Sequence, residues 1–243
     1  MEEINIQKVD TLVFDFDHTI SIGNGPVLAY AEQIQSRQLA QDAEFAGFAE
    51  EVSAMLTDYP AGDYPGLTAK DAYFLVHELA LKRGVPQDLI DESYYASRAL
   101  LATEQAPIFA PEGLAEYLKT VKNDRGDSLR VVLVTNAPAE RIPEALSVIG
   151  LDQSFDEVHT SAKKPLGMIE LIRPWLSEGR VLSIGDIWVN DLAPVQELGG
   201  HTAYITSNPE PHQPDFWGQD VSVLLPRITE WLDLPATSDF TSE

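Results

Sequence analysis

The sequence predicts an α/β protein in which a doubly wound, Rossmann-like parallel sheet core carries an inserted all-α domain. Two observations support this prediction. Short apolar runs that end in polar residues or glycine alternate with segments of helical spacing, which is typical of a sheet covered by helices on both faces. The long stretch between the first and second apolar runs shows helical spacing alone.

Four apolar runs are expected to be strands buried on both faces, because each is continuous and stops at polar or turn residues. These runs are 11–14, 130–134, 181–184 and 202–205. Helix-like segments lie between the later runs, at 138–149, 165–176 and 189–198. This alternation favours a doubly wound sheet with parallel strands.

The stretch 26–103 has apolar residues at helical spacing and no strand-like run, so we expect four helices there. Breaks between them are expected near Gln41, at 59–62 and at 84–86. Prolines at both return points suit hinge-like linkers. We therefore expect an α/β core domain formed by residues 1–22 and 108–243, and a helical domain formed by residues 23–107.

The composition bears on partners and location. With 16 basic and 39 acidic side chains, the chain has a formal net charge of −23, so we expect no nucleic-acid partner and no membrane partner. It has no cysteine, which excludes a zinc–thiolate site and a cysteine nucleophile. The first residues lack the basic start and apolar stretch of a signal peptide, so we expect a cytoplasmic protein. The sequence makes no prediction of oligomeric state.

Polar side chains follow three of the predicted strands at the edge where those strands end. They are Asp15, Asp17, Thr135, Asn136, Asp186 and Asp191. Because the carboxyl ends of parallel strands converge on one crevice, we expect these side chains to lie close together. Clustered carboxylates need a compensating charge, and ligands that are all oxygen atoms favour Mg²⁺.

Such a site could bind and transfer a phosphoryl group. The Thr135 hydroxyl, nearby backbone amides and a lysine from the 163–165 loop could donate hydrogen bonds to phosphate. An aspartate beside the cation could attack phosphorus to form an acyl phosphate. A second carboxyl group two residues further on could protonate the leaving alcohol and then activate water.

Four ordered motifs resemble those of the haloacid dehalogenase-like (HAD) hydrolase superfamily. They are Asp15-x-Asp17-x-Thr19, Val134-Thr135-Asn136, Lys164-Pro165 and Gly185-Asp186-x-x-x-Asn190-Asp191. The similarity covers residues 9–20 and 110–232, and the segment between the first two motifs resembles the helical cap of that superfamily.

For the reaction itself, the resemblance implies that Asp15 is the nucleophile and Asp17 the general acid and base. It also implies that Asp15, Asp17 and Asp186 hold Mg²⁺, with Asp17 contributing its backbone carbonyl. A halide leaving group needs no proton, and dehalogenases of this superfamily lack the second aspartate. The presence of Asp17 therefore favours phosphoryl transfer from an oxygen leaving group. His18 stands where the superfamily often has a small residue, which leaves the turn of the chain there open.

For binding, the resemblance implies that Thr135, Asn136 and Lys164 contact the substrate phosphate, with Lys164 also pairing with the nucleophile. Asp191 would not bind the cation directly, but would hold a metal-bound water or Lys164. Asn190 would be a polar neighbour of Asp191.

We therefore expect a Mg²⁺-dependent phosphatase that acts on a small phosphorylated metabolite through an aspartyl-phosphate on Asp15. Two alternatives remain open. A phosphomutase of the same fold would share every motif, and a non-catalytic relative would bind a metabolite or a protein through the cap. A phospho-accepting receiver module also uses an aspartate, a threonine and a lysine around Mg²⁺, but receivers are shorter and lack a helical insertion.

Overall fold

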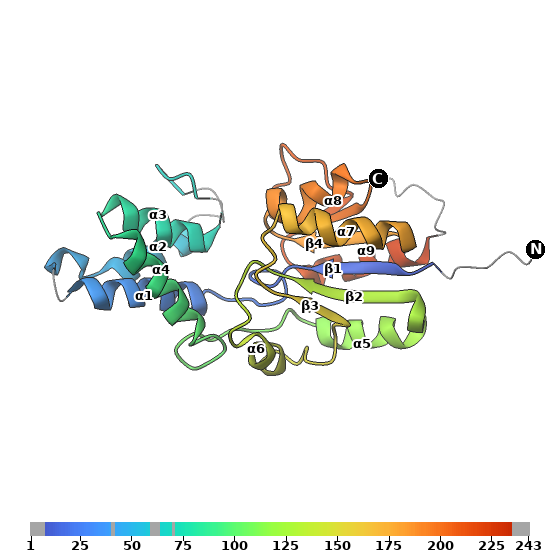
Figure 1. Ribbon diagram of the computed structural model, residues 1–243, viewed down its shortest axis with the longest axis horizontal. Coiled ribbons are helices and arrows are strands. Elements are labelled where there is room, and N and C mark those ends of the chain that lie inside the picture. The colour runs from blue at the N-terminus through green and yellow to red at the C-terminus, as the bar shows by residue number, and fades with distance from the viewer. Residues whose placement is uncertain (1–7, 40–41, 59–63, 70, 235–243) are drawn as a thin grey trace, which may run out of the picture. The chain divides into compact units, whose positions relative to one another are not determined.

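A computed structural model describes residues 8–39, 42–58, 64–69 and 71–234 (Figure 1). Within these ranges six parallel strands form one sheet in the order β3-β2-β1-β4-β5-β6. The strands are β1 (Asp10–Phe14), β2 (Leu129–Val134), β3 (Glu157–His159), β4 (Val181–Gly185), β5 (His201–Ile205) and β6 (Phe216–Gly218). The strand order runs outward from β1 in both directions, which confirms the predicted doubly wound sheet.

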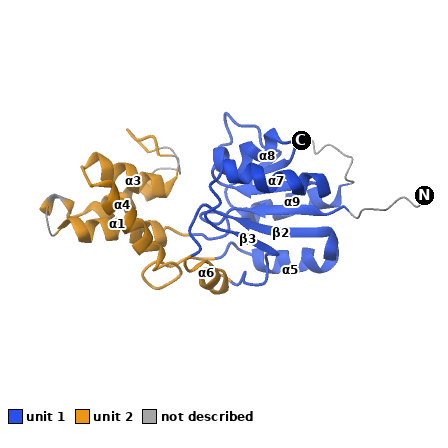
Figure 2. Ribbon diagram, viewed as in Figure 1, with its two compact units in different colours: residues 1–22, 110–139, 150–243 blue, residues 23–109, 140–149 orange. Residues whose placement is uncertain are grey.

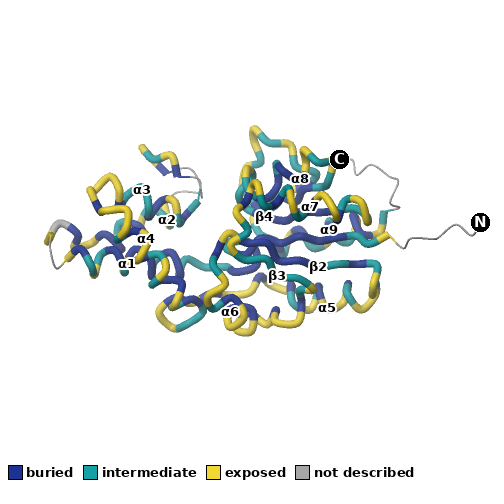
Figure 3. Tube along the Cα trace, viewed as in Figure 1, coloured by how far each residue is buried: buried dark blue, intermediate teal, exposed yellow. Residues whose placement is uncertain are grey.

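The central strands are buried on both faces, as their continuous apolar runs predict. Every residue of β4 is buried, and so are the last four of β1 (Figure 3). Val13 and Val132 pack with Met168 and Trp175 in one apolar cluster. The core of the sheet therefore lies along β1 and its two neighbours.

Five helices accompany the strands in the described residues. They are α5 (Leu114–Arg125), α6 (Ile142–Val148), α7 (Leu166–Glu178), α8 (Ala193–Glu197) and α9 (Val221–Asp233). The helix expected at 189–198 is instead a short π-helix, Trp188–Leu192, followed by α8. Contacts join α7 with α8 and α5 with α9, and right-handed connections place these two pairs on opposite faces of the sheet.

Four further helices lie in the stretch where the sequence predicts four. They are α1 (Gly25–Leu39), α2 (Phe48–Asp58), α3 (Ala72–Lys82) and α4 (Gln87–Arg98). Their shared core includes Val27, Ile34 and Phe48. The break predicted at 84–86 separates α3 from α4, while those predicted near Gln41 and at 59–62 lie outside the described residues. Among the helices in the described ranges, none combines the length and the apolar character that a membrane span needs.

The chain divides into two compact units (Figure 2). Unit 1 carries the sheet and consists of Met1–Ile22, Ala110–Ala139 and Gly150–Glu243, while unit 2 consists of Gly23–Phe109 and Glu140–Ile149. These units differ from the expected domains at α6, which groups with the helical unit. Within unit 2, Arg141 Nε donates a hydrogen bond to the Leu101 carbonyl at 2.7 Å.

Candidate active site

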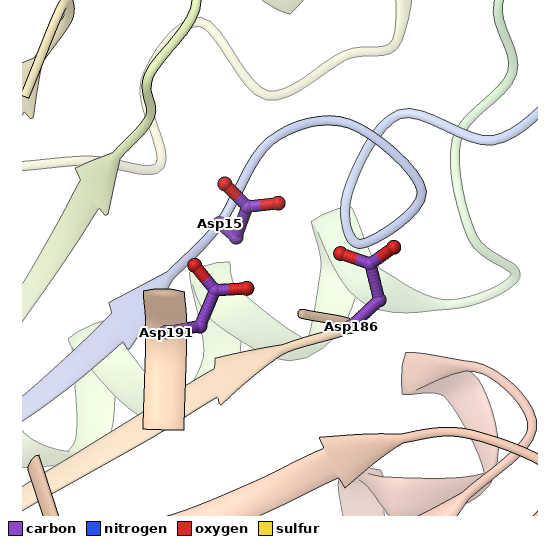
Figure 4. Close-up of side chains that lie close together, drawn as sticks. All are labelled: Asp15, Asp186 and Asp191. Atoms are coloured by element: carbon purple, nitrogen blue, oxygen red, sulfur yellow. The ribbon is translucent and has the colours of Figure 1, made fainter. Parts of the chain in front are cut away.

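Three carboxylates lie together at the carboxyl end of the sheet (Figure 4). Asp15 follows β1, Asp186 follows β4, and Asp191 lies on the π-helix after β4. One carboxylate oxygen from each residue lies within 4.8 Å of the other two. The topology therefore brings together acidic residues that lie far apart along the chain.

The chain turns tightly between Asp186 and Asp191, and glycine makes this turn possible. A Cβ atom at Gly185 would lie 2.6 Å from the Asp191 Cβ, so no larger residue fits there without a shift. The Ile187 N–H donates to Asp191 Oδ2 at 3.0 Å, and the Ser183 hydroxyl donates to the Asp191 carbonyl at 2.8 Å. Asp191 is consequently almost fully buried, with its second carboxylate oxygen left for Lys164.

Lys164 supplies a positive charge inside this cluster. Its Nζ donates hydrogen bonds to Asp15 Oδ1 at 2.6 Å, to Asp191 Oδ1 at 2.5 Å and to the Val134 carbonyl at 3.0 Å. The Lys164 side chain is only 3% exposed, whereas the adjacent Lys163 is exposed to solvent. Lys164 is thus the lysine that joins the carboxylates.

Burial and charge shift the pKa values of this ion pair. Burial raises the pKa of Asp15 to about 7, against the opposing attraction of Lys164. Burial alone would lower the pKa of Lys164, but the charges of Asp15 and Asp191 outweigh it and the pKa is raised. Lys164 therefore keeps its charge at neutral pH, and a cation at this cluster would favour the ionised form of Asp15.

The loop after β2 contributes Thr135 and Asn136. Thr135 is buried, and its hydroxyl oxygen accepts the Ala137 N–H at 3.0 Å, which leaves the hydroxyl proton to donate. The sequence predicts that Asn136 contacts phosphate. In the structure its amide contacts the main chain of Lys164, accepting from the N–H at 2.7 Å and donating to the carbonyl at 3.4 Å, and its contact with phosphate stays a prediction.

Asp17 and His18 lie in the turn that follows β1. The Phe16 carbonyl accepts the N–H groups of Ile20 and Ser21, and His18 has a left-handed backbone with φ of 59°. The Asp17 charge is one of the smaller causes of the raised pKa of Asp15, after burial. The sequence left open how the chain turns at His18, and the structure shows a left-handed backbone there.

Two features of the site have no signal in the motifs. The Val134 carbonyl accepts a hydrogen bond from Lys164, and aromatic side chains from β5 and the following loop pack on the π-helix. Asp191 lies in the carboxylate cluster and accepts a hydrogen bond from Lys164. Asn190, its predicted neighbour, donates its backbone N–H to the Ile187 carbonyl at 3.0 Å.

The strand order places this chain among doubly wound α/β folds with acidic residues at the carboxyl edge of the sheet. Several solved structures have a similar fold. YfnB from Bacillus subtilis, bound to magnesium, aligns with 91% of this chain and 99% of its own at 17% identity and a TM-score of 0.59. A HAD phosphatase from Thermococcus onnurineus aligns with 94% of this chain and 100% of its own, at 17% identity and a TM-score of 0.55. A 2-haloacid dehalogenase from Pseudomonas syringae pv. Tomato DC3000 aligns with 92% of this chain and 99% of its own, at 17% identity and a TM-score of 0.52.

The chain therefore has the fold of haloacid dehalogenase-like hydrolases. No family model matches the sequence, and no curated protein matches it.

Proposed function

We propose that this chain is a hydrolase of the haloacid dehalogenase-like superfamily, and that it is a Mg²⁺-dependent phosphatase acting on a small phosphorylated metabolite. One observation carries the proposal. Asp15, the candidate nucleophile, shares a buried cluster with Asp186, Asp191 and Lys164 at the carboxyl end of a parallel sheet. The same fold in a magnesium-bound protein supports the choice of cation.

The residues of the site fit a hard divalent cation, because the donors are all oxygen atoms. When ionised, the three clustered carboxylates against one ammonium group leave a net charge of −2, which Mg²⁺ would offset. Asp15 and Asp186 would hold the ion together with the backbone carbonyl of Asp17. When bound, Mg²⁺ would offset the charge on the phosphoryl oxygens.

The proposed reaction proceeds in two steps through Asp15. In the first, an Asp15 oxygen attacks phosphorus, the bond from phosphorus to the leaving oxygen breaks, and Asp17 donates a proton to that oxygen. In the second, Asp17 removes a proton from water as the water attacks phosphorus, which releases phosphate and restores Asp15. Thr135 would donate a hydrogen bond to a phosphoryl oxygen, and the positive charge of Lys164, whose protons are donated to Asp15, Asp191 and Val134, would offset the charge of the phosphoryl group.

Asp17 supports phosphate release over halide release. A dehalogenase shares this fold, so the fold alone does not separate the two reactions. An alkoxide leaving group needs a proton and a halide does not, so a general acid next to the nucleophile is useful only for the former. Asp17 lies two residues after Asp15 in the turn that follows β1, which supports its assignment as the general acid.

Hydrolysis of p-nitrophenyl phosphate by the purified chain tests the proposal. We expect release of inorganic phosphate with Mg²⁺ present and loss of that activity with a chelator. Asp15→Asn should lower kcat by at least about 10³-fold, because an amide cannot act as the nucleophile. Asp124→Asn removes the same charge at an exposed position and is the matched control.

Turnover that survives Asp15→Asn would overturn the proposed nucleophile. Transfer of phosphate between positions of a sugar phosphate, with no release of inorganic phosphate, would favour a phosphomutase instead.

A further inference from the structure

Three aromatic side chains pack together next to the turn that carries Asp186 and Asp191. The rings of Trp188 and His212 are stacked, with centroids 4.4 Å apart and planes 8° from parallel. Tyr204 approaches both rings edge-on, with its centroid 5.5 Å from Trp188 and 6.1 Å from His212. We call Trp188, Tyr204 and His212 the aromatic clamp.

Tyr204 ties the clamp to the sheet. It lies on β5 in register with Gly185, the last residue of β4, so its backbone is fixed by the strand pairing. Burial, and after it the charge of Asp186, raise the pKa of the Tyr204 hydroxyl. Trp188 therefore connects the turn after β4 to the neighbouring strand.

His212 ties the clamp to the loop of residues 206–215, which other contacts hold in place. Gln196 of α8 donates its side-chain amide to the carbonyl of Gln213 at 2.8 Å. Asp215, at the end of the loop, accepts two hydrogen bonds from the start of β5, at 2.8 and 3.0 Å. His212 is thus presented to Trp188 by a loop that is anchored on both a helix and a strand.

The turn itself has an uncommon backbone. Asp191 lies on the π-helix Trp188–Leu192, and π-helical turns are rare and need support from the surrounding structure. The turn supplies two of the three clustered carboxylates, Asp186 and Asp191. A change in its conformation would therefore alter most of the oxygen donors of the site.

We propose that Trp188 is a positioning residue for the cation site, and that the aromatic clamp keeps Asp186 and Asp191 placed against Asp15. This inference rests on the proposed function, since it concerns the Mg²⁺ that the reaction requires. Trp188 does not contact the reacting atoms in this account. It acts through the turn.

Calorimetric titration with Mg²⁺, in the absence of substrate, measures the effect directly. Trp188→Ala should raise the Kd for Mg²⁺ at least about tenfold, as is typical when a residue that orients metal ligands is removed. His212→Ala should raise the Kd by a smaller factor. Trp188→Phe keeps a ring in the clamp and should stay within about threefold of the wild type.

The same variants separate positioning from catalysis in turnover of p-nitrophenyl phosphate. For Trp188→Ala, the half-saturating Mg²⁺ concentration should rise with the Kd, while kcat at saturating Mg²⁺ should change by less than about threefold. Ile228→Ala removes a buried side chain of α9 outside the clamp, and it is the control for general loss of stability. It should leave the Kd for Mg²⁺ unchanged.

The inference is wrong if Trp188→Ala and His212→Ala bind Mg²⁺ with the wild-type Kd, or if Ile228→Ala weakens binding as much as Trp188→Ala does. Should Trp188→Ala not fold, His212→Ala and Trp188→Phe carry the test. A wild-type protein that binds no Mg²⁺ would overturn the proposed function itself. If the wild type binds Mg²⁺ and the variants bind it equally well, only the role of the aromatic clamp is overturned.

Discussion

At the scale of single residues, the buried ammonium of Lys164 is the centre of the site. Its three hydrogen bonds join the end of β1, the end of β2 and the π-helix, through Asp15, Val134 and Asp191. The two carboxylates keep its pKa raised in spite of burial, so the side chain stays charged. Removing one member of a buried group of charges leaves the others uncompensated, which is strongly destabilising.

Lys164→Met tests this dependence. We expect kcat for p-nitrophenyl phosphate to fall at least about 10²-fold, because the phosphoryl group loses a nearby positive charge and Asp15 loses its partner. Without Mg²⁺, the free energy of unfolding in urea should fall by about 3 kcal/mol, because two buried carboxylates lose their partner. Lys163→Met is the matched control, since Lys163 is adjacent and exposed. Similar losses in the two variants would contradict the role assigned to Lys164.

The motifs predict which residues form the site, but they do not predict every contact. The contact of Asn136 with the Lys164 main chain is one that the motifs do not predict. In the loop before Lys164, Ser161 and Lys163 have φ values of 49° and 56°. Left-handed backbone at serine and lysine is uncommon, and no local pattern encodes it.

At the scale of elements, strands with long apolar runs were predictable and the edge strands were not. β3 and β6 have three residues each, and β3 reads Glu-Val-His. β3 is a strand because Val132 to Val134 of β2 pair with it, so tertiary pairing and not propensity sets its structure. The π-helix was likewise predicted as part of a longer helix, because its apolar spacing resembles that of an α-helix.

Asp215 connects β6 to β5 and makes the contribution of this sheet edge to the free energy of unfolding depend on pH. Its carboxylate accepts the Thr202 N–H and hydroxyl, at 2.8 and 3.0 Å, and pairs with His201 at 3.1 Å. Burial raises the pKa of Asp215, but these hydrogen bonds outweigh burial and the pKa is lowered below the ordinary value. The resulting stability is fully present above the unfolded-state pKa, and it is lost as the pH falls through the lower folded-state pKa.

Asp215→Asn should therefore lower the free energy of unfolding by about 1–2 kcal/mol at pH 7. The difference from the wild type should narrow below about pH 4, as the Asp215 carboxylate is protonated. Urea unfolding across this range measures it. Asp127→Asn, an exposed substitution with the same change in charge, should show little difference at any pH. If the difference in free energy of unfolding between Asp215→Asn and the wild type did not narrow in acid, the role of the Asp215 hydrogen bonds would be contradicted.

At the scale of the whole molecule, the alternation of strand and helix was enough to predict the doubly wound sheet and the separate helical stretch. The grouping of α6 with the helical unit was not predicted, and one contact within that unit, from Arg141 to the carbonyl of Leu101, joins residues forty positions apart in the chain. The carboxylate cluster was predictable for a different reason. Parallel strands all end at one edge, so topology brings Asp15 and Asp186 together, and the turn after β4 adds Asp191.

The central claim is that these carboxylates share one divalent cation. Anomalous diffraction from crystals of the protein soaked with Mn²⁺ tests it most directly, because Mn²⁺ prefers the same oxygen ligands as Mg²⁺ and its position can be located independently of the protein atoms. The account predicts a single strong peak at about 2.0–2.3 Å from carboxylate oxygens of both Asp15 and Asp186. No peak at this cluster, or a peak bound only elsewhere on the chain, would contradict it.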